Sequence, residues 1–143
     1  MTIAAHIVTP DAAQASDWYQ RALGAVEVGR VPLPGGKVMA VAMHLANSDF
    51  HIASEFPDAG ILAPASIGGT ATVLQINIAD AQSLWDRAVA AGAEIRHPIG
   101  DTFWGELHGQ FTDPFGHRWN IAQRLRDVSP EDIAAAAAKA FGG

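Results

Sequence analysis

A carboxylate and an imidazole recur at every second residue over a short stretch that also holds a tryptophan. Trp104, Glu106, His108 and Gln110 have this spacing. Because successive side chains of a β-strand point to opposite faces, we expect the four to share one face, with Glu106 and His108 about 7 Å apart at their Cα atoms. A carboxylate can orient an imidazole for acid–base catalysis, so both are candidate catalytic residues. The alternative for the same pair is solvated packing on the sheet without any chemistry.

The polar face continues beyond a tight turn at residues 112–116, where Arg118 and Asn120 alternate with apolar residues. Arg118 could bind a carboxylate or phosphonate group through two parallel hydrogen bonds, or instead pair with a nearby carboxylate such as Asp113. Trp104 would offer a ligand a flat, polarisable wall. We therefore hypothesise that this face lines a ligand-binding cleft.

The composition excludes several classes of partner and chemistry. A formal net charge of −6 and the lack of a basic run argue against nucleic acid and anionic membranes as partners. The chain has no cysteine, which excludes disulfides, thiolate catalysis and cysteine-bound metals. No apolar run approaches the roughly 20 residues of a membrane span, and the N-terminus lacks the pattern of a signal peptide. We therefore expect one cytoplasmic domain across the 143 residues.

The elements that must position these residues follow a pattern that occurs twice. Residues 1–56 predict a strand, a helix and three further strands as a first module. Residues 57–69, rich in proline, glycine and alanine, predict a surface linker. Residues 70–124 repeat the first pattern as a second module, and a C-terminal helix is expected over 129–141. The predicted fold class is α+β, with two paired β-α-β-β-β modules.

Capping and turn residues predict two element boundaries. Thr9, followed by proline, is expected as the N-cap of the first helix, and the last two strands are expected to form a hairpin over 102–123.

Segments 18–28 and 84–95 are similar in sequence, which indicates an internal duplication. Chance similarity of two amphipathic helices is the alternative.

The chain resembles the vicinal oxygen chelate superfamily, which contains glyoxalases, bleomycin-resistance proteins and extradiol dioxygenases, and more narrowly its PhnB-like branch. The resemblance is carried by residues 103–106, Gly109, 113–119 and 127–131. It implies two modules whose strands form a curled mixed sheet around a shared cleft, in agreement with the repeat. It also implies a homodimer, which would cover the exposed edges of such open sheets.

The resemblance further implies four positions at which metal-dependent members bind a divalent ion such as Ni, Zn, Mn, Fe or Mg. The matching residues are His6, Glu55, Gln75 and Asn120. Neutral amides at two of them are weak ligands for a hard dication, so a metal-free pocket lined by the same residues is the alternative. His51 precedes Glu55 by four residues, about 13 Å along a strand, so we expect it to line the cleft or its rim instead of sharing the ion.

Two classes of function stay open from the sequence. The first is a protein similar to the bleomycin-resistance branch that binds a small planar or anionic organic ligand between the modules, without a high-affinity metal. The second is an enzyme. It would be either a divalent-metal-dependent lyase, isomerase or oxygenase that uses His6 and Glu55, or a metal-free enzyme that uses Glu106 and His108.

Overall fold

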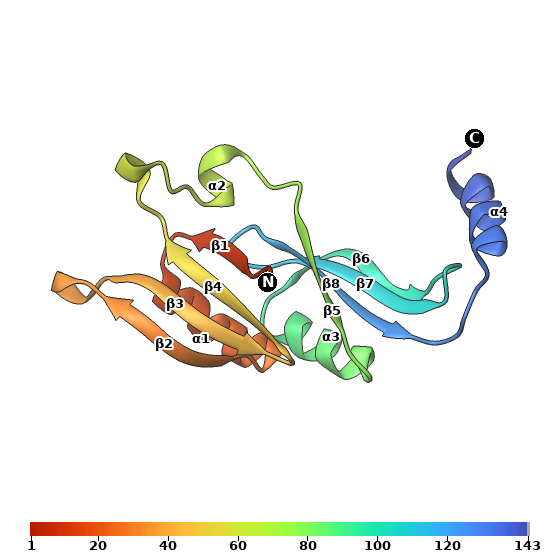
Figure 1. Ribbon diagram of the computed structural model, residues 1–143, viewed down its shortest axis with the longest axis horizontal. Helices are drawn as coiled ribbons and strands as arrows, with labels where there is room; N and C mark the ends of the chain where they lie inside the picture. The colour runs from red at the N-terminus through yellow and green to blue at the C-terminus, as the bar shows by residue number, and fades with distance from the viewer. Residues whose placement is uncertain (143) are drawn as a thin grey trace.

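The computed structural model describes residues 1–142 and contains the element order β-α-β-β-β twice (Figure 1). The first module comprises β1 (Ala5–Thr9), α1 (Ala12–Leu23), β2 (Val26–Pro32), β3 (Val38–Leu45) and β4 (Ser48–Ser54). The second comprises β5 (Val73–Asn77), α3 (Ala81–Ala90), β6 (Glu94–Asp101), β7 (Glu106–Thr112) and β8 (Arg118–Arg124). The short helices η1 (Pro34–Gly36), η2 (Pro57–Ala59) and α2 (Pro64–Ile67) lie in loops, and α4 (Pro130–Phe141) follows the second module. The predicted α+β fold with a C-terminal helix is confirmed.

Each module folds its four strands into one mixed sheet. The strand orders are β1-β4-β3-β2 and β5-β8-β7-β6. The first strand of each module runs parallel to the last, and the remaining neighbours are antiparallel. The same order in both sheets agrees with an internal duplication.

A single hydrophobic core joins the two modules on one side of the sheets. The apolar stripes of the two long helices supply its largest side chains, among them Trp18 and Tyr19 of α1 and Trp85 of α3. Figure 1 shows α1 behind β2 and β3 and α3 beside it, under the second sheet, and the two helices are in contact. Because both helices cover the same side, the opposite face of each sheet is left open.

Hydrogen bonds between the modules reinforce this helix contact. Trp18 Nε1 donates to the carbonyl oxygen of Ala91 at 2.8 Å. The Arg87 guanidinium, from α3, donates to the carbonyl oxygens of Gln20 and Arg21 at the end of α1, at 3.0 and 2.7 Å. A side chain of one module therefore closes the helix of the other, where the last carbonyls of a helix have no internal partner.

A buried carboxylate forms a second link between the modules. Asp113, in the turn between β7 and β8, accepts hydrogen bonds from the Tyr19 hydroxyl, from Trp119 Nε1 at 2.9 Å and from two backbone N–H groups of its own turn. His117, in the same turn, donates from Nε2 to the Val8 carbonyl oxygen at 2.7 Å. The turn of the second module is thereby held against the first strand and first helix of the other.

Element boundaries differ from the prediction in two places. Asp11, not Thr9, caps α1, because its side chain accepts from the first backbone N–H groups of the helix while Thr9 is still paired in β1. The final hairpin begins at Glu106 and not at residue 102, because Gly105 adopts φ +96° in a turn.

The segment over 57–69 is more structured than a plain linker. It contains η2 and α2, and Phe56 pairs with Ile61 across the first turn. Pro64, the first residue of α2, lies so close to Gly116 that a Cβ there would be 2.8 Å from the Pro64 Cβ. The segment thus packs on the β7–β8 turn of the second module.

The C-terminal helix lies apart from the rest of the chain. It projects beyond the far end of the second sheet, and none of its residues is buried (Figure 1). None of the helices within residues 1–142 has the length and apolarity needed to cross a membrane.

Candidate functional site

The open face of the second sheet carries a row of amide side chains that hydrogen-bond across the strands. Gln110 donates to Asn120 Oδ1 at 3.0 Å, and Asn120 donates to Gln75 Oε1 at 3.3 Å. Gln75 in turn donates to Asn77 Oδ1 at 2.9 Å. The strand register places these residues side by side, since Asn120 is opposite both Gln110 and Gln75. The predicted polar face therefore exists as a connected row, named here the amide row, that includes Asn77.

At one end of the amide row, a cleft of about 710 Å³ lies between β1 and β5, where the two modules meet. Its polar lining includes His6, Gln75 and Arg118, and its apolar lining includes Leu74 and Trp119. The volume falls within the range of small-molecule sites, and so does this mixture of apolar wall and few polar groups. We refer to it as the inter-module cleft.

Arg118 is the charged group of the inter-module cleft with no counter-ion. Among residues 1–142, no ion pair or side-chain hydrogen bond engages its guanidinium. Asp113 is committed to Tyr19 and Trp119 in the core. The acidic residue of the cleft, Asp49, contacts His44 Nδ1. Arg118 is therefore available to an anion that enters from solvent.

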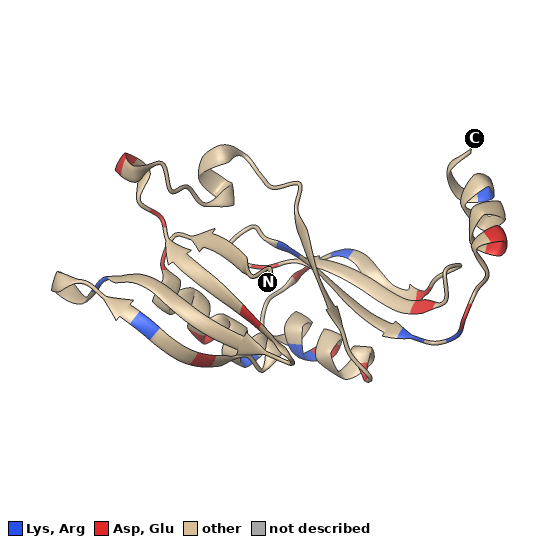
Figure 2. Ribbon diagram, in the orientation of Figure 1, with Lys and Arg blue, Asp and Glu red and all other residues tan. Residues whose placement is uncertain are grey.

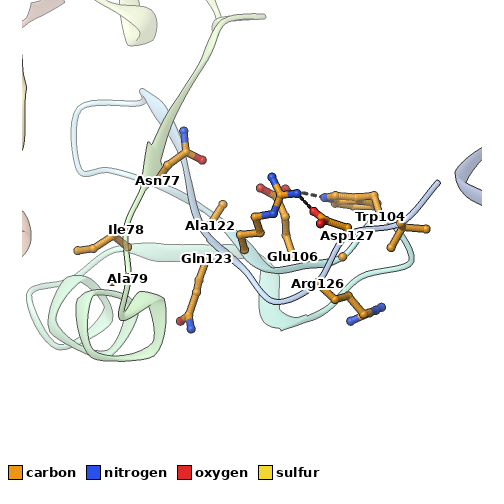
Figure 3. A pocket seen from close by; sticks show the side chains of 12 residues that line it. Asn77, Ile78, Ala79, Trp104, Glu106, Ala122, Gln123, Arg126 and Asp127 are labelled. Carbon is orange, nitrogen blue, oxygen red and sulfur yellow. Dashed lines mark hydrogen bonds and ion pairs between the residues drawn. The ribbon is translucent and has the colours of Figure 1, made fainter. Parts of the chain in front are cut away.

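A second cleft of about 810 Å³ opens at the other end of β7 and β8 (Figure 3). Trp104 and Glu106 line it, and Trp104 Nε1 donates to Glu106 Oε1 at 2.7 Å. Across from them, Arg124 forms an ion pair with Asp127. Arg126, which also lines this second cleft, pairs with Asp101. Because its charged side chains already have partners, the cleft presents mainly the indole surface and polar groups that are engaged with one another.

His108 lies beside the second cleft and faces the ring of Trp104 edge-on, with ring centroids 5.5 Å apart. Burial lowers the pKa of His108 below its usual value of 6.5. The nearby Glu106 carboxylate raises this pKa, and His97 lowers it further. The Glu106 carboxylate is bonded to Trp104, and no hydrogen bond joins it to His108 within the described chain. The imidazole is therefore neutral near pH 7 and has its carboxylate neighbour turned toward the indole.

The structure divides the predicted site residues between the two clefts. His6, Gln75 and Arg118 line the inter-module cleft, whereas Trp104 and Glu106 line the second cleft. Arg118 and Arg124 mark the two ends of β8, and six residues of strand span about 20 Å. A small ligand in one chain cannot touch both ends, so the two clefts are separate sites joined by the amide row.

His51 takes a different position from the other site residues. Its ring stacks on that of His6 across β1 and β4, with centroids 4.5 Å apart and planes 19° apart. It lies on the neighbouring strand, next to the His6 side chain that lines the inter-module cleft.

The four positions that the resemblance assigns to a divalent metal do not form a donor set that fits one. Glu55 Oε1 accepts from the Ala63 N–H at 2.9 Å, and hydrogen bonds from Ser66 and Ala63 lower the pKa of this carboxyl. It is thus engaged with the segment before the second module. The remaining donors are the His6 imidazole and two amides of the amide row, and no group of three histidines or carboxylates clusters within residues 1–142. With Glu55 drawn toward Ala63, one imidazole and two neutral amides supply too little negative charge to hold a hard dication.

Three residues at the clefts were not predicted from the sequence. Asn77 lies two residues beyond Gln75, so the alternation of β5 was the signal that could have found it. Arg124 continues the alternation of Arg118 and Asn120 along β8, so the same signal could have found it. Asp127 lies in the segment after the strand, where no periodic pattern applies. The role of both depends on how that segment folds back along Gly105, to which Leu125 and Arg126 donate backbone hydrogen bonds.

Known proteins are similar to this chain in sequence and in fold. The family model described as "Glyoxalase/Bleomycin resistance protein/Dioxygenase superfamily" matches residues 3–121. An uncharacterised protein of Mycobacterium bovis is 36% identical over 134 residues, which cover 92% of this chain and 88% of that protein.

Solved structures with the same fold include TioX from Micromonospora sp. ML1, with a TM-score of 0.68 and 20% identity over 90% of this chain and 100% of TioX. The PhnB protein from Bacillus cereus has a TM-score of 0.64 and 15% identity over 86% of this chain and 99% of its own. At these identities the two structures establish the fold and nothing further.

Proposed function

Because the chain belongs to the Glyoxalase/Bleomycin resistance protein/Dioxygenase superfamily, we propose that it binds a small anionic organic molecule in the inter-module cleft. The observation that carries this proposal is the Arg118 guanidinium, which lines that cleft without a counter-ion among the described residues. A planar guanidinium binds a carboxylate or phosphonate through two parallel hydrogen bonds. Arg118 is thus the anchor of the ligand's anionic group.

The rest of the ligand is accommodated by the other walls of the cleft. Leu74 and Trp119 provide apolar contact for an organic group, and burial of apolar surface adds affinity that an ion pair alone does not. His6 and Gln75 supply hydrogen-bonding groups that fix its orientation. No metal is required in this proposal, because charge on the ligand is met by Arg118.

The narrower assignment to the PhnB-like branch is part of the same proposal. It is supported by residues 103–106 and 113–119, which carry the resemblance to that branch.

A second candidate function is acid–base catalysis by Glu106 and His108 at the second cleft. The observation that favours it is the lowered pKa of His108, which keeps the imidazole neutral and able to accept a proton near pH 7. Trp104 would then contact the substrate as a flat wall. This function places the ligand about 20 Å from Arg118 along β8.

Titration calorimetry with benzoate, phenylphosphonate and neutral benzamide separates these possibilities. We expect the two anions to bind and benzamide not to bind. Arg118→Gln should weaken anion binding about tenfold to a hundredfold, the loss of a charge-assisted hydrogen-bond pair. The matched control is Arg96→Gln, which removes the same charge from an exposed position that lines neither cleft.

Equal weakening by Arg96→Gln would show that only net charge matters and would overturn the assignment of Arg118. Binding that survives Arg118→Gln but is lost in Trp104→Ala would transfer the ligand to the second cleft. Failure of every probe to bind would refute the proposal of a general anion site at Arg118.

A further inference from the structure

The C-terminal helix leaves the body of the chain beyond the second sheet and makes no substantial contact with the other elements of residues 1–142. Its base is held firmly, because the Arg126 guanidinium donates to the Asp101 carboxylate and to the Thr102 carbonyl oxygen, each at 2.9 Å. Ser129 caps the helix by accepting from the Asp132 N–H at 3.1 Å. Beyond this point α4 makes no substantial contact with any other element of the described chain, and none of its residues is buried.

One side of α4 is nevertheless apolar, as in helices that pack against another surface. Its apolar residues follow the i, i+3, i+4, i+7, i+8 spacing of a buried helix face. They are Ile133, Ala136, Ala137, Ala140 and Phe141. Phe141 is 82% exposed, and a helix of 12 residues is marginal in water without a packing surface. We name these five residues the α4 stripe.

A second exposed apolar surface lies on the first module, along the outer edge of its sheet. The β2–β3 hairpin exposes Val26, Val28, Val31 and Met39, with Val28 62% exposed. Figure 1 shows β2 along the lower edge of the first sheet, running from near the middle of the molecule toward its left end, and α4 beyond the right end of the second sheet. The joined helix core separates the two surfaces, so the stripe of one chain cannot reach its own hairpin while the modules stay packed.

The charges of the two surfaces are complementary. Residues 26–45 carry Arg30 and Lys37 against Glu27, two bases minus one acid, a net charge of +1. The helix α4 carries Glu131 and Asp132 against one lysine, two acids minus one base, a net charge of −1. Figure 2 shows the acidic residues at the start of α4. Opposite charge favours the encounter of these surfaces over the pairing of two identical helices.

We propose that α4 of one copy packs its apolar stripe on the β2–β3 hairpin of a second copy of this chain. Each copy offers one helix at one end and one hairpin at the other. A twofold arrangement therefore forms both contacts at once and covers both apolar surfaces. The contact is independent of which ligand occupies the inter-module cleft and goes beyond the proposed function.

Engineered cysteines test this contact directly, since the chain has no cysteine of its own. Two single variants, Ala137→Cys on the stripe and Val28→Cys on the hairpin, are mixed and oxidised mildly. We expect a disulfide-linked heterodimer on a non-reducing gel. The matched control mixes Val28→Cys with Ala135→Cys, which is exposed on the opposite side of α4 and should give little cross-linked product.

Sedimentation analysis of the uncrosslinked protein supplies a second measurement. Phe141→Glu should raise the dimer dissociation constant at least about tenfold, as expected when one large apolar side chain leaves an interface. Ala135→Glu should leave that constant unchanged. Circular dichroism of both variants checks that these exposed substitutions leave the fold intact.

Three outcomes would overturn the proposal. They are equal cross-linking at positions 135 and 137, a wild-type chain that sediments as a monomer at all concentrations, and an unchanged dissociation constant in Phe141→Glu. Anion binding at Arg118 is measured separately by calorimetry, so failure of the helix contact and failure of the proposed function are told apart.

Discussion

Removal of the Tyr19 hydroxyl should destabilise the whole chain, although Tyr19 lies in neither cleft. The hydroxyl donates to the buried Asp113 carboxylate, so Tyr19→Phe deletes one hydrogen bond to a charged group without changing the shape of the core. Such bonds contribute about 1.5–3 kcal/mol. At about 4 °C per kcal/mol for a chain of this length, the midpoint of thermal unfolding should fall by about 6–12 °C.

The same residue predicts how stability depends on alkaline pH. Burial raises the pKa of Tyr19 well above 10.0, and the charge of Asp113 and the hydrogen bond to it act in the same direction. A group whose pKa is raised on folding stabilises the protein fully below the pKa of the unfolded chain, and this stability is lost as the pH rises through the folded pKa. The wild-type chain should therefore lose stability above about pH 10 through this group.

The chain has one tyrosine, which makes this assignment unique. Urea unfolding at a series of pH values between neutral and strongly alkaline gives the free energy of unfolding for wild type and Tyr19→Phe. The difference between the two should be greatest at neutral pH and shrink above about pH 10. Tyrosinate absorbance reports the same ionisation independently. Equal stability of the two proteins at neutral pH, or a constant difference at all pH values, would refute the role assigned to this bond.

Two further predictions concern the second cleft and the sheet behind it. The pKa of His108, followed by NMR, should lie below 6.5; Glu106→Gln should lower it further and His97→Gln should raise it, whereas a value above 6.5 would contradict the burial of this ring. Gly109→Ala should cost about 1–3 kcal/mol of unfolding free energy, because a Cβ there would lie 2.7 Å from Trp85 Cζ3 and 2.9 Å from Ile99 Cα. Gly29→Ala, where nothing lies within 4 Å, is its control, and equal denaturation curves for the two variants would argue against the close packing at Gly109.

The sequence predicted which residues share a face, because that property depends only on the two-residue period of a strand. Gln110, Asn120 and Gln75 do lie side by side on one open face. It did not predict how far apart along that face the residues lie, since Arg118 and Glu106 are at opposite ends of the same hairpin. The division into two clefts follows from strand length and the course of the chain after β8.

The alternation of residues along a strand does not predict contacts between residues that are distant in sequence. The turn around Asp113 is recognisable from its proline and glycine, but its partner Tyr19 is 94 residues away. Glu55 follows its strand with the expected alternation, yet the folding of residues 57–69 draws its carboxylate to Ala63. Thr9 and Asp11 are both good capping residues, and pairing of Thr9 in β1 decides in favour of Asp11.

The helix junction has a consequence for how the two halves of the chain unfold. Arg87 of the second half closes the end of α1, and His117 bonds to Val8 of the first. Either half expressed by itself would leave these backbone carbonyls and the shared core exposed to water. Each module therefore depends on the other, and the two should unfold in a single cooperative step.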